Sequence, residues 1–145
     1  MDRHAATINQ TINQTIGRVA LGASLVGAGI GHFSFARTEF RAQVPRWVPM
    51  NEDTVVLLSG AVEVLLGLAL LVLPRRWRPM VGVIAAGFFI AVFPGNIAQW
   101  RQGVDAFGLD SDLKRAVRLL FQPALVVLAL WSTGGWLWLR RSARR

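Results

Sequence analysis

The residue with the clearest potential for chemistry is Glu63, an acidic side chain in the middle of an apolar stretch between Val55 and Leu73. It follows Thr54 by about 13 Å of helical rise. An acid at such a depth in a membrane costs roughly 2.5–3.5 kcal/mol on insertion scales, so Glu63 should face protein or a wet cavity. We expect an uncharged carboxyl that either forms a hydrogen bond between helices or handles a proton or a ligand.

Four further polar residues lie near one end of the other apolar stretches. The imidazole of His32 can carry a proton near neutral pH, or it can simply be a hydrogen-bonded partner inside a bundle. Asn96 follows a Pro–Gly pair that should bend a helix, either for packing or to free backbone carbonyls. Arg118 and Gln122 share one helical stripe, from which Arg118 either reaches lipid phosphate or points inward as a fixed cation.

These four residues are predicted at one membrane side, with Glu63 deeper. We therefore predict a polar cavity that opens at that side and has Glu63 at its floor, provided that the helices are rotated to bring the side chains together. No metal site is expected, because the two histidines, His4 and His32, fall on opposite sides and the chain has no cysteine. Nucleotide, haem and flavin motifs are also missing, so no catalytic residue is assigned and enzymatic activity stays an open question.

Four apolar segments must position these residues, and each is long enough to cross a hydrocarbon core of about 30 Å. Because backbone groups in lipid must be paired internally and no strand alternation persists, each segment is predicted to be a helix. The short Pro74–Pro79 connection favours antiparallel neighbours, and hence an all-α, up-down four-helix bundle as a single membrane domain. The predicted spans are residues 16–36, 55–73, 80–98 and 117–139, with an interfacial helical extension at residues 7–15.

The composition agrees with a membrane protein. Of the 145 residues, 53% are hydrophobic and 17% are charged, whereas soluble domains carry about 25% charged residues. The lack of cysteine excludes disulfides and thiolate chemistry. The net charge of +8 would also fit nucleic-acid binding, but the arginines lie at the edges of the spans, so we expect membrane lipids and no nucleic acid as partners.

Orientation follows from the basic residues beside the spans. The side with both termini and the Pro74–Pro79 loop carries a net charge of +8, because nine arginines share it with one acid, Asp2. The opposite side has a net charge of +1, and Glu63 accounts for the difference from the total. Both termini are therefore predicted to be cytoplasmic.

Small residues at helical spacing predict where the helices approach closely. Gly60 and Gly67 form such a stripe around Glu63, and the other two stripes comprise Ala23, Gly27 and Gly31 in the first span and Gly87, Ala91 and Gly95 in the third. Packing within the bundle is the expected role of all three, although the same stripes are compatible with a homo-oligomer.

Four sequence phrases carry a resemblance to a known family. They are GHF (Gly31–Phe33), VPRWVP (Val44–Pro49), SGAVEVLLGLALL (Ser59–Leu71) and VFPGNIAQW (Val92–Trp100). Together they resemble the DoxX family of small bacterial membrane proteins, over nearly the whole chain. The resemblance implies a multi-pass, four-helix protein of the bacterial inner membrane, with Glu63 as the main functional position and His32 and Asn96 beside it.

The same resemblance implies a redox setting. Some DoxX relatives are membrane subunits of thiosulfate–quinone or other redox complexes, and others are linked to oxidative and thiol stress. Because this chain has no cysteine, a redox role would have to pass through a bound quinone or a partner redox-enzyme subunit. The leading hypothesis is thus an auxiliary or quinone-contacting subunit; the alternatives are a small proton-coupled transporter and a scaffold or assembly factor without catalysis.

Overall fold

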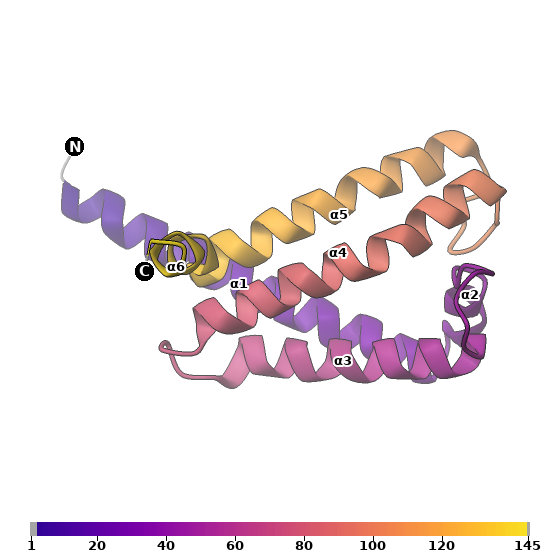
Figure 1. Cartoon of the computed structure of the whole chain (residues 1–145). Helices are drawn as coiled ribbons and strands as arrows, with labels where there is room; N and C mark the ends of the chain where they lie inside the picture. The colour runs from indigo at the N-terminus through magenta and orange to yellow at the C-terminus, as the bar shows by residue number, and fades with distance from the viewer. Residues whose placement is uncertain (1–2, 145) are drawn as a thin grey trace.

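Four long helices form the body of the protein. The computed structural model describes the backbone of residues 3–144 and the side chains of residues 7–144, and every regular element in that part is helical. The helices α1 (Arg3–Phe33), α3 (Glu52–Val72), α4 (Arg78–Gln102) and α5 (Asp112–Thr133) follow one another up and down (Figure 1). All four contain segments with the length and hydropathy of membrane spans. The predicted all-α, four-helix membrane bundle is confirmed.

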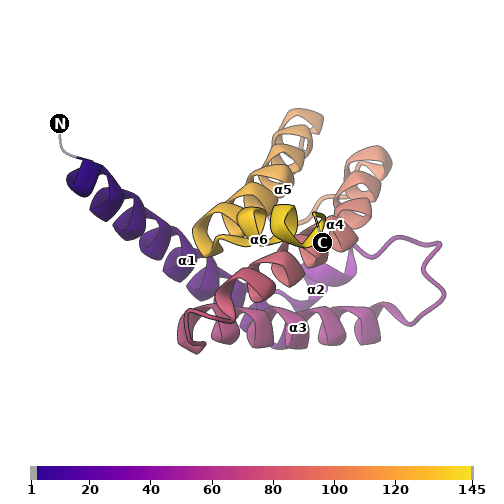
Figure 2. The same ribbon diagram turned by 60° about the vertical axis from the view of Figure 1, so that its left-hand side comes forward.

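The four helices are arranged as two pairs. The first helix packs mainly on α3, and α4 packs mainly on α5, while α1 also contacts α5. In contrast, α3 and α4 touch sparsely, although a short connection joins them. Figure 1 shows that these two helices diverge from their common hairpin, and Figure 2 shows the same separation from a second side. The space between the two pairs positions the candidate site described below.

Glycines bring α1 and α3 into close contact. A Cβ atom added to Gly67 would lie 2.6 Å from the Gly22 carbonyl oxygen, and one added to Gly29 would lie 2.7 Å from the Gly60 carbonyl oxygen. One added to Gly60 would lie only 2.5 Å from Cβ of His32. The packing role predicted for Gly60 and Gly67 is therefore present, and the two backbones approach as closely as small residues allow.

The packing role within the bundle predicted for the whole small-residue stripes of the first and third spans is wrong for most of their members, although Gly31 is buried and Gly95 lies against the Gln43 carbonyl. Ala23 and Ala91 are exposed, and a Cβ atom at Gly27 or Gly87 would meet no atom within 4 Å. The reason is helix rotation, because the first helix has small residues on more than one face and the face that packs on α3 is the one that carries Gly22 and Gly29.

A buried arginine caps the end of α3. Arg18 is 5% exposed, and its Nη1 donates to the carbonyl oxygens of Leu70 and, at 3.4 Å, Leu71. These carbonyls belong to the last turn of α3, whose oxygens have no helical donor. A positive charge is also favourable at a helix C-terminus. The basic residue that interrupts the first apolar segment is thus accounted for by helix capping.

The predicted fourth span, residues 117–139, is corrected by a helix break. Gly134 adopts a left-handed conformation with φ of 77° and ends α5 at Thr133. The chain then turns into α6 (Gly135–Ser142), which lies across the end of the bundle (Figures 1 and 2). A left-handed glycine after the last helical residue is a common helix stop, and the stretch from residue 134 onward therefore does not continue the span.

The other boundaries differ from the prediction by smaller amounts. The first helix ends at Phe33 and runs without a break through residues 7–15, where Ile8, Ile12 and Ile16 form an exposed stripe. The helix of the third predicted span, α4, continues through Pro94 and ends at Gln102. A short helix that the sequence analysis did not predict, α2 (Arg37–Arg41), lies between α1 and α3.

The glycine contact between α1 and α3 yields a stability prediction. Gly67→Ala places a methyl group within 2.6 Å of the Gly22 carbonyl oxygen, so the helices must separate, and we expect a loss of about 1–3 kcal/mol in the free energy of unfolding. Gly87→Ala is the matched control, because no atom lies within 4 Å of the added methyl. Unfolding of the purified protein in detergent measures both; equal stability of the two variants would contradict the packing described here.

Candidate ligand-binding cavity

A cavity of about 460 Å³ lies between the two helix pairs. Its walls come from all four long helices, from α2 and from the segment that follows α2. Most of the lining is apolar, with a small number of polar groups, as is typical of ligand sites. The five residues singled out from the sequence all line this one cavity: His32, Glu63, Asn96, Arg118 and Gln122.

The cavity is open at the surface rather than enclosed. Two of its lining side chains, Trp47 and Phe121, are 69% and 62% exposed. Phe121 belongs to α5, one of the membrane-spanning helices, whereas Trp47 lies in the segment between α2 and α3. A ligand dissolved in the bilayer can therefore reach the cavity from the flank of the bundle.

The imidazole of His32 and the carboxyl of Glu63 form a pair on one wall. His32 lies at the end of α1, is 4% exposed and packs against Gly60 of α3. Its Nε2 is 3.3 Å from Oε2 of Glu63. The two atoms are at ion-pair distance, but their alignment falls short of hydrogen-bond geometry, and neither has another hydrogen-bond partner in the described part of the chain. Both atoms are buried, and each is the other's polar neighbour.

Backbone contacts determine which imidazole nitrogen carries hydrogen. Nδ1 of His32 lies 2.9 Å from the Val56 carbonyl oxygen, which can only accept, so Nδ1 is the donor. Ser59 Oγ lies 3.0 Å from the same nitrogen and donates to the same carbonyl. A neutral His32 consequently presents the lone pair of Nε2 to Glu63. With one proton held by the pair, on the carboxyl or on the imidazole, the two side chains would have no net charge.

The opposite wall carries polar groups that lack partners. Nε of Arg118 is buried and has no hydrogen-bond partner within residues 7–144, and the guanidinium lies 5.6 Å from the centre of the Phe107 ring. The Asn96 side chain is 8% exposed, and it too makes no hydrogen bond to a described residue. Of the two orientations considered for Arg118, the structure has the inward one. Arg118 and Asn96 thus offer unused donors to the cavity.

Gln122 has a structural role beside this wall. Its Nε2 donates to the Phe89 carbonyl oxygen of α4 at 3.0 Å. The Phe89 carbonyl lies next to that of Ile90, which is the carbonyl left without a helical donor by Pro94. The Gln122 bond therefore joins α5 to α4 beside the proline, and Gln122 is less available to a ligand than Asn96 or Arg118.

The sequence analysis missed the aromatic residues that close one end of the cavity. The His32 ring packs on Phe40 of α2, with 3.5 Å between ring centres, and Phe40 packs on Phe107 at 4.7 Å. Gln43 Nε2 donates to Gln99 Oε1 at 2.8 Å and ties the same segment to α4. No spacing rule identifies such a bridge, because its members come from two connecting segments far apart in sequence.

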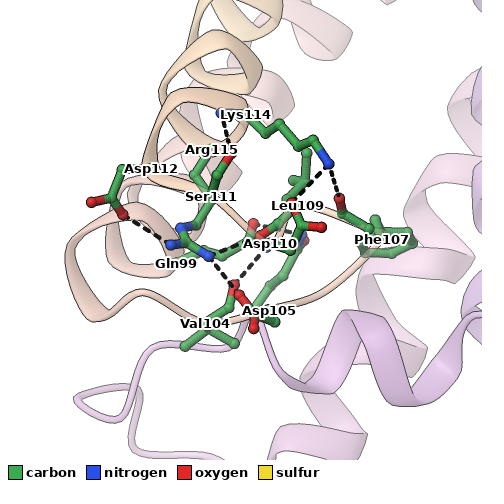
Figure 3. Close-up of polar contacts among 12 residues, drawn as sticks. Gln99, Val104, Asp105, Phe107, Leu109, Asp110, Ser111, Asp112, Lys114 and Arg115 are labelled. Carbon is green, nitrogen blue, oxygen red and sulfur yellow. Dashed lines mark hydrogen bonds and ion pairs between the residues drawn. The ribbon is translucent and has the colours of Figure 1, made fainter.

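The loop that carries Phe107 is held by charged contacts with α5 (Figure 3). Nη1 of Arg115 lies 2.6 Å from Asp105 and 2.9 Å from the Leu109 carbonyl oxygen, and its Nη2 lies 2.9 Å from Asp112. Lys114 bonds to Asp110 at 2.7 Å, and this hydrogen bond lowers the pKa of the Asp110 carboxyl. Phe107 itself has a positive φ of 56°, which is uncommon for a residue other than glycine. The loop contacts thus hold a ring in a constrained position over the cavity.

One comparison with known proteins returned a match. A family model described as a domain of unknown function (DUF8561) matches residues 21–133. The matched range extends from α1 to the last residue of α5 and includes every residue of the candidate site. No curated protein and no solved structure is similar enough to match. The chain belongs to the DUF8561 family, a domain of unknown function.

Proposed function

We propose that the cavity binds the head group of a membrane-soluble quinone and that the protein is an auxiliary or quinone-contacting subunit of a membrane redox complex. The observation that carries the proposal is the pairing of two walls in one cavity open to the flank of the bundle. One wall carries the His32–Glu63 pair, which would hold a proton, and the other offers the free donors of Asn96 and Arg118. A quinone head group needs both kinds of partner.

The residues present fit such a ligand. The terminal nitrogens of Arg118 and the Asn96 amide line the cavity without a hydrogen bond to a described residue, and they would donate to a carbonyl oxygen of the ligand. The apolar lining, with Val92 and Leu125, suits a ring and the beginning of its tail. A bound quinone would supply redox chemistry coupled to proton transfer. The chain itself would hold the proton at Glu63 Oε2 or His32 Nε2.

The resemblance to the DoxX family supports the same proposal, because some of its members are subunits of quinone-linked complexes. With no cysteine in the chain, electrons would have to come from a partner subunit. We place the protein in the bacterial inner membrane with both termini in the cytoplasm, since the basic excess lies on the side of the termini and the α3–α4 connection.

A second function is favoured by one observation. The two titratable side chains His32 and Glu63 line an open cavity as a close pair, an arrangement that would also suit a small proton-coupled transporter. Proton flux in proteoliposomes that depends on Glu63, from protein that retains no quinone, would support transport over redox chemistry.

The quinone proposal predicts a specific loss in Glu63→Gln. The amide has no acidic proton, so the pair can no longer give a proton to a bound quinone oxygen, and we expect roughly tenfold lower retention of quinone, as for loss of one hydrogen bond with an ionisable group. Native mass spectrometry of gently extracted protein, with quinone and lipid analysis of the same sample, measures the retention. Glu52→Gln is the control, because Glu52 is exposed and outside the cavity. Wild type without quinone, or equal retention in all three proteins, would contradict the proposal.

Replacement of Arg118 separates ligand binding from scaffolding. Because Arg118 makes no hydrogen bond to a described residue and has the Phe107 ring as its cation–π contact, we expect Arg118→Gln to lower the free energy of unfolding by only about 1 kcal/mol while quinone affinity falls roughly tenfold. Titration with a soluble short-tail quinone, followed by intrinsic tryptophan fluorescence, gives the affinity, and thermal unfolding gives the stability. If the variant unfolds easily but an intact fraction binds quinone as wild type does, Arg118 has a purely structural role.

A further inference from the structure

The end of the bundle that carries α6 gathers arginines from two distant parts of the chain. We call them the arginine surface. They come from the connection between α3 and α4 and from the C-terminal segment: Arg75, Arg76, Arg78, Arg140, Arg141 and Arg144. Figures 1 and 2 place α6 and this connection at the same end. A Cβ atom at Gly135 would lie 3.2 Å from the Pro79 carbonyl oxygen, so the start of α6 is seated on the start of α4.

The charge of the arginine surface is not neutralised by the described part of the chain. None of its six members forms an ion pair there, whereas Arg37, Lys114 and Arg115 at the opposite end all pair with aspartates. The acids from residue 7 onward lie at that opposite end, with the exception of Glu63 in the cavity. The arginine surface is therefore a concentrated, unpaired positive charge at one end of a membrane bundle.

Exposed apolar side chains accompany these arginines. The eight-residue helix α6 exposes three large apolar side chains: Trp136 by 49%, Leu137 by 58% and Trp138 by 43%. The guanidinium of Arg140 lies 5.0 Å from the ring centre of Trp136, and that of Arg76 lies 5.9 Å from the ring centre of Trp77. A helix that crosses the end of the bundle and carries both tryptophan and arginine has the composition of an interfacial membrane helix.

We propose that the arginine surface binds the phosphate groups of anionic phospholipids, with α6 lying in the plane of the membrane interface. The tryptophan and leucine side chains would enter the boundary between head groups and acyl chains, while Arg140 and Arg141 contact phosphate. This mixture of exposed apolar and cationic groups favours a bilayer over an acidic soluble protein, which would offer nothing to the leucine and tryptophan side chains. The inference is independent of the quinone proposal and uses no residue of the cavity.

The test compares lipid retention by the purified full-length protein. Wild type is mixed with equal amounts of phosphatidylglycerol and phosphatidylcholine, and bound lipids are counted by native mass spectrometry. Arg140→Gln combined with Arg141→Gln should lower phosphatidylglycerol affinity by roughly fivefold for each arginine, with phosphatidylcholine unchanged. Arg41→Gln combined with Arg46→Gln is the matched control, because these two exposed arginines lie outside the arginine surface. A preference for phosphatidylglycerol that is the same in wild type and both double variants would overturn the proposal.

Two further measurements keep the test decisive if the α6 variant is unstable. Arg75→Gln combined with Arg76→Gln should show a similar loss without any change in α6. Added salt should weaken phosphatidylglycerol binding to the unaltered protein, because exposed charges are screened. Binding that is indifferent to salt and to the Arg75 and Arg76 changes would overturn the proposal. Copurification of an acidic protein that depends on these arginines, with lipid retention equal in wild type and variants, would also overturn the proposal.

Discussion

The close approach of α1 and α3 is the constraint on which both the fold and the candidate site depend. It requires glycine at Gly60, where a Cβ atom would lie 2.5 Å from Cβ of His32. Because that atom is absent, the imidazole lies against α3 and contacts the Val56 carbonyl, Ser59 and Glu63 at once. In lipid, helices gain no hydrophobic energy from association, so close packing and interhelical polar contacts must hold them together. The contact between Gly60 and His32 provides the close packing, and it also brings the imidazole to its polar partners on α3.

The cavity exists because the second helix pair does not close on the first. If α3 and α4 were packed along their whole length, the space beside Glu63 would be filled. Instead the pairs meet through α1 and α5 and are bridged at one end by Phe40 and Phe107. The charged contacts of Arg115 hold the loop that carries this bridge. The cavity is thus lined by connecting segments as well as by helices.

The sequence predicts which segments span the membrane and how deep Glu63 lies. It does not predict how each helix is rotated about its own axis. The four spans follow from hydropathy, and the inward position of Glu63 follows from the free energy of placing an acid in lipid. The face of α1 that packs on α3 carries Gly22 and Gly29, while the equally regular stripe that includes Gly27 faces away. Small residues occur on several faces of this helix, so spacing alone does not identify the interface. The bridge through Phe40 was hidden for a related reason, since tertiary contacts between two loops leave no periodic pattern.

The charge balance of the cavity explains why it is a better candidate for function than for stability. Glu63 lies at ion-pair distance from His32, and no described acid forms an ion pair with Arg118. The Phe107 ring provides a favourable face for the guanidinium but leaves Nε without an acceptor. Two other buried polar side chains of the bundle, Arg18 and Gln122, find acceptors in backbone carbonyls. Arg118 and Asn96 make no such bond to a described residue, although both line the cavity with His32 and Glu63, and an acceptor from outside the chain would complete them there.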